Sequence, residues 1–289
     1  MTAPAFWQIL KMRCVRLTLA ALSVVLLGAC STVVPVPTGS NARAAGSAAD
    51  GGGASAISPD EASAGYARVL QRHVNDQGEV DFAGLRDDVT DAGLGALESF
   101  VRAIAMTPLD AAPTQQARLA HMVNAYNALS MYNAIASGIP PSHQGFAKVK
   151  FFVLRKFVIG GTPMSLYDFE NSVIRKPGEP RVHFALNCSA VSCPALPRAV
   201  FTAERLNDEL EGETLKFFAR VENLRVDDAR RTVFFNQILK FYTEDFVPGH
   251  GENLIAYAQR YTIQKIPADY TIAFNAYDWT IANSRRHGQ

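Results

Sequence analysis

The chain has 289 residues, and its 28 Lys and Arg against 27 Asp and Glu leave a formal net charge of only +1. A balance this even argues against nucleic acid as the main partner, because phosphate binding requires a clustered basic face. Hydrophobic residues make up 48% of the sequence, which is ordinary for a globular protein even though the N-terminal region inflates the figure. What remains after that region is long enough for one domain with a sizeable core.

The first thirty residues have the order of a bacterial lipoprotein signal peptide. Basic residues precede an apolar run, Leu17 to Leu27, which is shorter than the roughly 20 residues of a membrane span but has the length of a signal-peptide core. The run ends in Leu27-Gly28-Ala29-Cys30, which resembles the lipobox. We therefore expect residues 1–29 to be removed and Cys30 to carry the lipid, since several acyl chains on one residue anchor a protein stably.

This anchor would hold the mature chain in the cell envelope, facing the periplasm. Ser31 follows Cys30 where an Asp would favour inner-membrane retention, so by resemblance the outer membrane is expected. Either Met1 or Met12 could be the start, because Met12 to Cys30 alone makes a complete signal. Residues 30–57 are rich in Ala, Gly, Ser, Pro and Thr and predict a lipidated Cys followed by a disordered tether. An arm that packs on the domain is the alternative.

From residue 58 onward the sequence predicts one α+β domain, 58–289. Ser58, Pro59 and Glu61 form a capping box for a helix that ends near His73. The further predicted elements are an extended piece at 80–82, helices at 94–104 and 115–135, a strand over 150–159 that turns at Gly160-Gly161 into a second strand, a helix from Ser165 to before Pro177, a strand at 182–187, a helix at 202–220, a hairpin at 224–235, helices at 237–242 and 252–259, and a strand at 270–274. Helices outnumber strands, so we expect a helix-rich domain with short antiparallel hairpins packed on helices.

One predicted helix carries a polar stripe. His121, Asn124 and Asn127 fall within an arc of roughly 120°, and apolar residues take the opposite side. Because Asn is a poor helix former, two on one face suggest that the amides have a task. Structural hydrogen bonding, support of an active site and an ordinary solvated face are the three interpretations.

A second cluster lies in the segment that runs from Arg181 to Pro194, where a loop of small residues begins and ends with Cys188 and Cys193. Export to an oxidising compartment favours a disulfide between them. The alternatives are two buried thiols, a metal site with His183, and a Cys188 nucleophile with His183 as its base. His183 and Cys188 would face opposite ways in a flat strand, so contact requires the loop to bend back. The spacing H-x4-C-x4-C matches no standard zinc pattern, so no metal is expected, and no cofactor either.

The other polar candidates have a supporting role. Arg175 lies near the end of its helix and suits the helix dipole there. Asp245 and Asp278 lie in aromatic-acid clusters, where a core carboxylate with hydrogen-bond partners is the simpler interpretation than a catalytic acid. Glu170 and Arg181 belong to the motifs that follow.

Several short motifs in this order resemble the domain of unknown function 547. They are Val80-Asp81-Phe82, Asn124-Ala125-Tyr126-Asn127-Ala128, Ser165-Leu166, Phe169-Glu170-Asn171-Ser172-Val173-Ile174-Arg175, Arg181-Val182-His183-Phe184-Ala185-Leu186-Asn187-Cys188, Ser192-Cys193-Pro194, Phe241-Tyr242 with Asp245-Phe246, and Tyr277-Asp278-Trp279. The resemblance covers roughly Glu61 to the C-terminus. Two departures are His121-Met122, where the family usually has an aromatic pair, and Asn171, where it often has a His. If that His were catalytic in the family, this chain would lack it at residue 171. The family also occurs in intracellular proteins, where a stable disulfide is unexpected.

Two functions from different classes follow. The first is a membrane-tethered periplasmic binding or assembly module whose partner is an envelope protein or a small molecule, with the Cys pair as a staple. The second is a thiol-dependent hydrolase or transferase on an envelope substrate. Cys188 would then be the nucleophile, His183 its base, and Asn124 or Asn127 the orienting amide. The sequence favours the binding module slightly.

Overall fold

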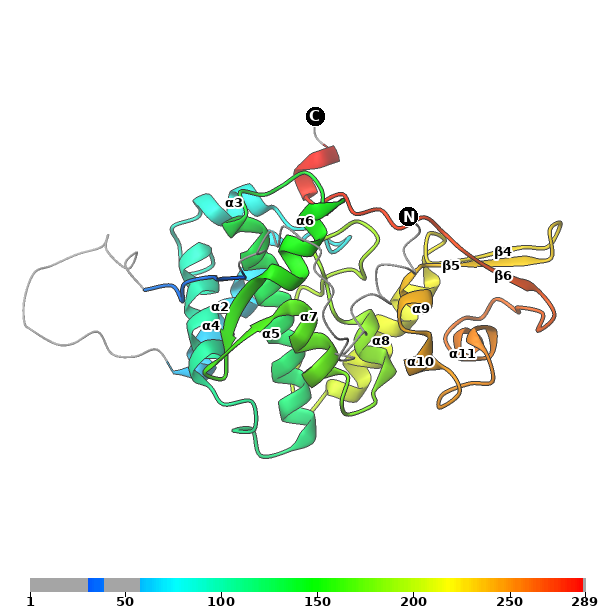
Figure 1. Cartoon of the computed structure of the whole chain (residues 1–289), viewed down its shortest axis with the longest axis horizontal. Coiled ribbons are helices and arrows are strands. Elements are labelled where there is room, and N and C mark those ends of the chain that lie inside the picture. The colour runs from blue at the N-terminus through cyan, green and yellow to red at the C-terminus, as the bar shows by residue number, and fades with distance from the viewer. Residues whose placement is uncertain (1–30, 39–57, 288–289) are drawn as a thin grey trace, which may run out of the picture. The chain divides into compact units, whose positions relative to one another are not determined.

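The computed structural model describes residues 31–38 and 58–287. These residues form an α+β fold, as predicted: helices pack with two three-stranded sheets, ordered β1-β2-β3 and β4-β5-β6 (Figure 1). The signal peptide, Cys30 and residues 39–57 of the expected tether lie outside the described residues. Within the described part, no helix is both long and apolar enough to cross a bilayer.

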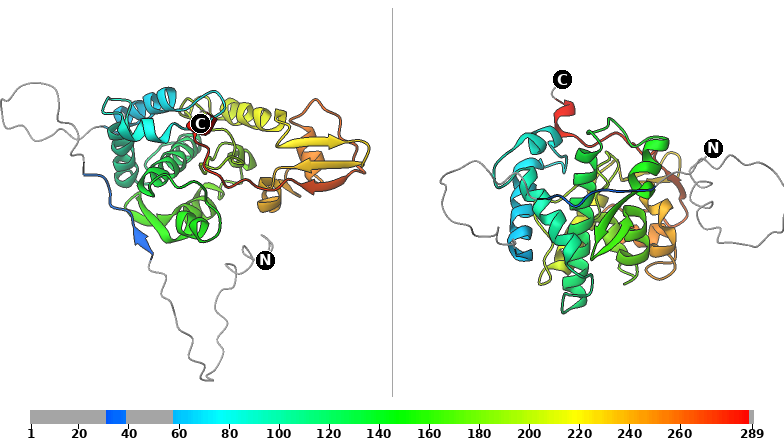
Figure 2. Two further views of the ribbon diagram at one scale, coloured as in Figure 1. Left: turned by 90° about the horizontal axis from the view of Figure 1, so that it is seen from above. Right: turned by 60° about the vertical axis from the view of Figure 1, so that its left-hand side comes forward.

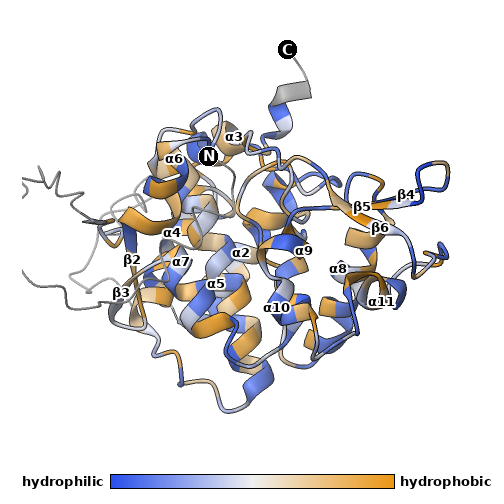
Figure 3. Ribbon diagram, turned by 45° about the vertical axis from the view of Figure 1, so that its right-hand side comes forward, coloured by the Kyte–Doolittle hydropathy of each residue, from blue (hydrophilic) through white to orange (hydrophobic). Residues whose placement is uncertain are grey.

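The first hydrophobic core is built on α5 (Gln115–Ala136). The elements around it are α2 (Pro59–His73), α3 (Phe82–Asp87), α4 (Leu94–Met106), α6 (Phe146–Val149), the π-helix η1 (Lys150–Leu154), β2 (Arg155–Ile159), β3 (Thr162–Ser165), α7 (Leu166–Phe169) and the π-helix η2 (Glu170–Ile174). Nearly every residue of α5 from Leu119 to Ala134 is buried, and Figure 3 shows that polar as well as apolar residues occur along this helix. A helix buried on all sides is a core helix, so the predicted polar stripe does not face solvent.

The Ser58 N-cap at the start of α2 is confirmed, because the Ser58 hydroxyl accepts a hydrogen bond from the Glu61 N–H at 3.2 Å. The short helix α3 was not predicted. It begins one residue after Asp81, whose carboxylate accepts from the Gly84 N–H at 2.8 Å. Asp81 is therefore an N-cap, and the expected extended piece ends at Val80.

The expected tether is wrong for residues 31–38. Strand β1 (Thr32–Val33) pairs in parallel with Arg155 and Lys156 of β2, and the Val34 side chain is buried in the first core. Figure 2 shows this blue strand beside the green ones. The physical reason is a short run of β-branched residues, which pairs and packs well on a sheet despite the Ala- and Ser-rich sequence that follows.

The second core lies around the second sheet. The predicted hairpin is confirmed as β4 (Leu224–Asp227) and β5 (Thr232–Phe235), and β6 (Thr271–Phe274) joins β5 in parallel rather than forming another hairpin. The helices that pack here are α8 (Leu206–Ala219), α9 (Ile238–Phe241), α10 (Thr243–Phe246) and α11 (Leu254–Gln259).

Two predicted strands are helical. The predicted strand at 182–187 begins instead as a 3-10 helix, η3 (Pro180–Phe184), because its polar as well as its apolar positions are buried and the apparent alternation was misleading. This helix joins the two cores: Val182 lies in the first and Phe184 in the second. In the predicted strand 150–159, the first half is η1 and only Arg155–Ile159 is extended.

The C-terminal segment crosses the described domain after β6. Its isolated bridges join Thr280 to Ser142, Ile281 to Ala190 and Asn283 to Val80. A final 3-10 helix, η4, covers Ser284–His287. The segment therefore links the second sheet to the loop that carries the Cys pair.

Candidate functional site

The loop between η3 and α8 carries the Cys pair, and α5 holds this loop in place. The Asn127 Nδ2–H donates to the Ala185 carbonyl at 3.0 Å, and Asn127 Oδ1 accepts from the Asn187 N–H at 2.8 Å. Asn187 in turn donates to the Pro194 carbonyl at 2.7 Å and accepts from the Ser189 N–H at 2.8 Å. Two buried amides thus supply the backbone partners that this irregular segment lacks.

Asn124 does the same for a later part of the chain. Its Nδ2–H donates to the Phe201 carbonyl at 2.8 Å, and its Oδ1 accepts from the Phe201 N–H at 2.9 Å. Asn124 and Asn127 are 6% and 3% exposed, so the solvated-face interpretation fails and structural hydrogen bonding describes them. Neither amide contacts His183 through any of these bonds.

Cys188 and Cys193 form a disulfide that closes the loop. The Tyr277 hydroxyl donates to Cys193 Sγ at 3.2 Å and lies 3.6 Å from Cys188 Sγ, while the Cys188 N–H donates to Cys193 Sγ at 3.1 Å. Both residues are nearly buried, at 9% and 8% exposure. A thiolate nucleophile needs a free sulfur, so Cys188 has no nucleophilic role while this bond is closed.

His183 is engaged elsewhere. Its Nε2 lies 2.7 Å from Asp245 Oδ2 and its Nδ1 lies 3.9 Å from Glu170 Oε1, with the imidazole stacked on Tyr242 at a centroid distance of 4.0 Å. The expected contact between His183 and Cys188 is not among these. His183 lies in the 3-10 helix η3, and its imidazole points toward Asp245 of α10 rather than toward the loop.

Arg175 completes this charged group. Its Nε and Nη2 donate to the two carboxylate oxygens of Asp245 at 2.6 and 2.7 Å, and Asn171 Oδ1 accepts from Nη1. Burial raises the pKa of Asp245, but the hydrogen bonds from His183 and Arg175 outweigh it and hold the pKa well below its usual range. Asn171 accepts from the Arg175 guanidinium and donates to the Tyr167 carbonyl, so it positions Arg175 and, as an amide, does not titrate.

Three tyrosines gather around Glu170. The Tyr126 hydroxyl donates to Glu170 Oε2 at 3.1 Å, and Tyr242 also hydrogen-bonds this carboxyl group. Burial, followed by the nearby Glu170 charge, raises the pKa of Tyr126, Tyr242 and Tyr277 above the usual value. The three phenols stay protonated at neutral pH and serve as hydrogen-bond donors. Through Tyr277 this polar group reaches the disulfide.

Arg181 and Asp278 lie at the periphery. Arg181 forms ion pairs with Glu179 at 2.7 Å and Glu211 at 3.0 Å, which join η3 to α8. Asp278 is exposed and its carboxylate accepts from the Thr280 N–H at 2.9 Å, so it shapes a turn in the C-terminal segment. These contacts give both Arg181 and Asp278 a structural role.

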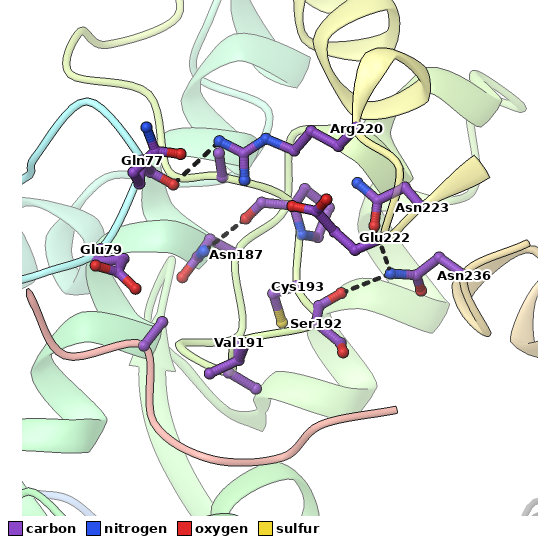
Figure 4. A pocket seen from close by; sticks show the side chains of 15 residues that line it. Gln77, Glu79, Asn187, Val191, Ser192, Cys193, Arg220, Glu222, Asn223 and Asn236 are labelled. Atoms are coloured by element: carbon purple, nitrogen blue, oxygen red, sulfur yellow. Dashed lines mark hydrogen bonds between the residues drawn. The ribbon is translucent and has the colours of Figure 1, made fainter. Parts of the chain in front are cut away.

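A polar pocket of about 230 Å³ lies against the disulfide loop (Figure 4). The residues that line it are Gln77, Gly78, Glu79, Asn187, Ala190, Val191, Ser192, Cys193, Pro194, Ala195, Arg220, Glu222, Asn223, Asn236 and Ala282. Asn236 Nδ2–H donates to the Ser192 carbonyl at 2.9 Å and to Asn223 Oδ1 at 2.8 Å, which fixes one wall. The wall that carries Cys193 is the motif loop itself.

The opposite wall is the turn before Val80. Gly78 has φ of +79°, and a Cβ there would lie 2.5 Å from the Leu196 nitrogen, so glycine allows the turn to lie against the motif loop. Arg220 donates to the Gln77 carbonyl at 3.2 Å across the pocket. The pocket is thus lined by one guanidinium, that of Arg220, and by the carboxylates of Glu79 and Glu222, which suits a ligand with both an acceptor and a donor group.

The sequence did not predict this pocket or the roles of Tyr126, Tyr277 and His143. Arg220 and Glu222 lie outside the motifs, and only the fold brings them to Cys193. Tyr126 and Tyr277 belong to quoted motifs, and this membership was the signal that could have singled them out. His143, which hydrogen-bonds the Cys188 backbone, had no motif around it. Among the described residues, no group of three or more His, Cys, Asp or Glu side chains is placed to hold a metal ion.

Comparison with known proteins gives one match. Residues 111–218 match the family model described as "Protein of unknown function, DUF547", which confirms the resemblance over this segment. The segment begins just before α5 and includes η2, η3, the disulfide loop and most of α8. No curated protein and no solved structure matches the chain.

Proposed function

We propose that this chain, whose residues 111–218 carry a DUF547 domain, is an exported, lipid-anchored binding module that takes a small polar ligand in the pocket beside the disulfide. The family description assigns no activity, so the proposal rests on the site. Cys30 would anchor the mature chain to the membrane, most simply the outer membrane with the domain in the periplasm.

The observation that carries the proposal is the polar pocket walled by the motif loop. Its volume of about 230 Å³ lies below the roughly 300–1,000 Å³ of sites for drug-sized ligands, which suits a molecule the size of an amino acid or a monosaccharide. Asn187 and Asn236 use their amides to hold the walls. Arg220, whose guanidinium keeps one hydrogen bond to the Gln77 carbonyl, and Glu222 both line the pocket, so a zwitterion or a sugar acid matches it best.

The disulfide supports export. Such bonds persist in oxidising compartments and are rare in the cytosol, and the pairing agrees with the lipoprotein signal in the first thirty residues. A thiol-dependent reaction is not proposed, because the disulfide and the separate engagement of His183 leave no activated nucleophile.

Ligand binding to the full chain tests the proposal. We would screen amino acids, short peptides and sugar acids by thermal shift and measure the hits by calorimetry. Arg220→Ala should weaken binding about 10- to 100-fold, because a hydrogen bond to a charged group contributes roughly 1.5–3 kcal/mol. Arg230→Ala, which removes an exposed guanidinium paired with Asp227, is the matched control. If the two variants bind every hit equally well, the pocket is not the binding site.

A further inference from the structure

Strand β1 fixes the chain to the domain almost from its mature start. Thr32 and Val33 pair with β2, and the Val34 N–H donates to the Lys156 carbonyl at 2.8 Å. The Val34 side chain is only 7% exposed and belongs to the first core. The Arg102 guanidinium donates to the Pro37 carbonyl at 3.4 Å, which holds the far end of this segment. The segment therefore packs on the domain along its length.

This attachment limits how far the domain can lie from a lipid on Cys30. Cys30 precedes Thr32 by two residues, and an extended residue spans at most about 3.6 Å. The Cα of Cys30 therefore lies within about 7 Å of the Cα of Thr32, where β1 begins. Residues 39–57 connect two segments that are both fixed on the domain, and they do not set this distance. Acyl chains on Cys30 must therefore enter the bilayer beside β1.

The surface beside β1 has the chemistry of a membrane-contacting face. Because β1 is parallel to β2, its start lies next to Arg155, where η1 ends. No Asp or Glu occurs between Asp110 and Asp168, yet this stretch contains α6, η1 and β2 with four basic residues: Lys148, Lys150, Arg155 and Lys156. Lysine and arginine near a bilayer attract anionic headgroups.

Two apolar side chains add to these charges. Phe146, at the start of α6, is 68% exposed, and Val33 is 49% exposed. Lys150 is exposed as well, whereas Lys148 lies over the Trp279 ring at 3.9 Å. Exposed apolar groups among basic ones are typical of surfaces that lie in the headgroup region.

We infer that the β1 face, defined by Val33, Phe146, Lys150 and Lys156, lies directly on the phospholipid surface, so that the domain is held against the membrane and does not swing on a long arm. This inference rests on the proposed lipid anchor at Cys30. It adds a second, non-covalent contact with the bilayer and fixes which side of the domain faces the periplasm.

Site-specific fluorescence on the full, lipidated chain tests this orientation. Phe146→Cys would be labelled with an environment-sensitive dye in vesicles that contain anionic phospholipid and a lipid-borne quencher. Ile263→Cys, an exposed position that follows α11, is the matched control. An acylated Cys30 and the paired Cys188 and Cys193 leave the introduced thiol to react. We expect quenching at 146 to exceed quenching at 263 several-fold.

Two further variants separate the contributions. Val34→Asp should release β1, so the chain stays on the vesicles through its lipid while quenching at 146 falls to the level at 263. Lys150→Glu with Lys156→Glu leaves the core untouched and should lower quenching at 146 on anionic vesicles, by roughly fivefold in the docked-to-undocked ratio for each charge removed. High salt should have the same effect.

The outcomes distinguish the inference from the proposed function. Equal quenching at both sites, in a chain whose Cys30 is acylated by mass spectrometry, overturns the β1-face contact and leaves the anchor intact. A Cys30 that carries no lipid, in a chain that does not sediment with vesicles, overturns the anchor and with it this inference.

Discussion

Removing the disulfide should weaken the fold by a modest and calculable amount. Cys188 and Cys193 are separated by five positions, and the chain-entropy relation for so short a loop gives about 2 kcal/mol at 25 °C. In a domain of this size each kcal/mol lowers Tm by roughly 2–4 °C. The double variant Cys188→Ser/Cys193→Ser should therefore unfold about 4–8 °C below the parent chain.

Scanning calorimetry with and without reductant measures this shift. Reductant should lower the Tm of the parent chain to that of the double variant and leave the double variant unchanged. Alkylation without reductant, followed by mass spectrometry, should find neither Cys188 nor Cys193 reactive. A parent Tm that is insensitive to reductant, with both thiols alkylated from the outset, would refute the reasoning. The Asn127 hydrogen bonds alone would then hold the loop, and the thiol-enzyme hypothesis would be open again.

Three further predictions concern buried polar groups. Burial lowers the pKa of His143 to about 4 from roughly 6.5 in the unfolded chain. The free energy of unfolding should therefore be at its full value above pH 6.5 and fall by up to roughly 3 kcal/mol as pH drops toward 4. In His143→Phe, the free energy of unfolding from urea titrations should depend less on pH in this window, and an equal pH dependence in both proteins would contradict the prediction. The lowered pKa of Asp245 means that its pairs with Arg175 and His183 stabilise the fold at neutral pH and weaken as pH falls below about 4. Asp245→Asn should lower the free energy of unfolding by about 1–2 kcal/mol at pH 7, after solvent screening, and by less at pH 3. An unchanged denaturation midpoint of this variant at pH 7 would exclude the contribution. Asn124→Leu removes two buried backbone partners and should cost roughly 2 kcal/mol or more in urea unfolding, whereas an exposed change such as Val89→Ala should cost almost nothing.

Local signals predicted the helices well because they act over few residues. Ser58 and Ser165 each cap a helix by accepting from the third N–H that follows, as their sequences indicated. The π-helical turns at η1 and η2 had no such signal, since each extends or follows a short helix under tertiary packing. The predicted strand at 182–187 failed because alternation of apolar residues implies a strand only when the polar positions face water, and His183 and Asn187 are both buried.

Long-range partners were beyond the sequence. Thr32 finds its strand partner at Arg155, and Thr271 finds Thr232, and neither pairing has a local signature. The motifs identified Glu170, Arg175, His183 and Asp245 as important, but the geometry assigns them to each other and not to Cys188. A pairing hypothesis built on residue types alone joined His183 to the nearest cysteine in sequence, whereas the fold joined it to a carboxylate far along the chain.

The C-terminal segment has a consequence for biogenesis. Its residues from Thr271 to Asn283 supply pairing partners for β5, Ala190, Ser142 and Val80, so four separate parts of the described fold pair with residues that are synthesised after them. Contacts this distant in sequence slow folding, and an exported chain would reach its final form only after complete translocation. A stop codon just before Thr271 should therefore yield a protein that proteases degrade, although every residue of the pocket except Ala282 would still be present.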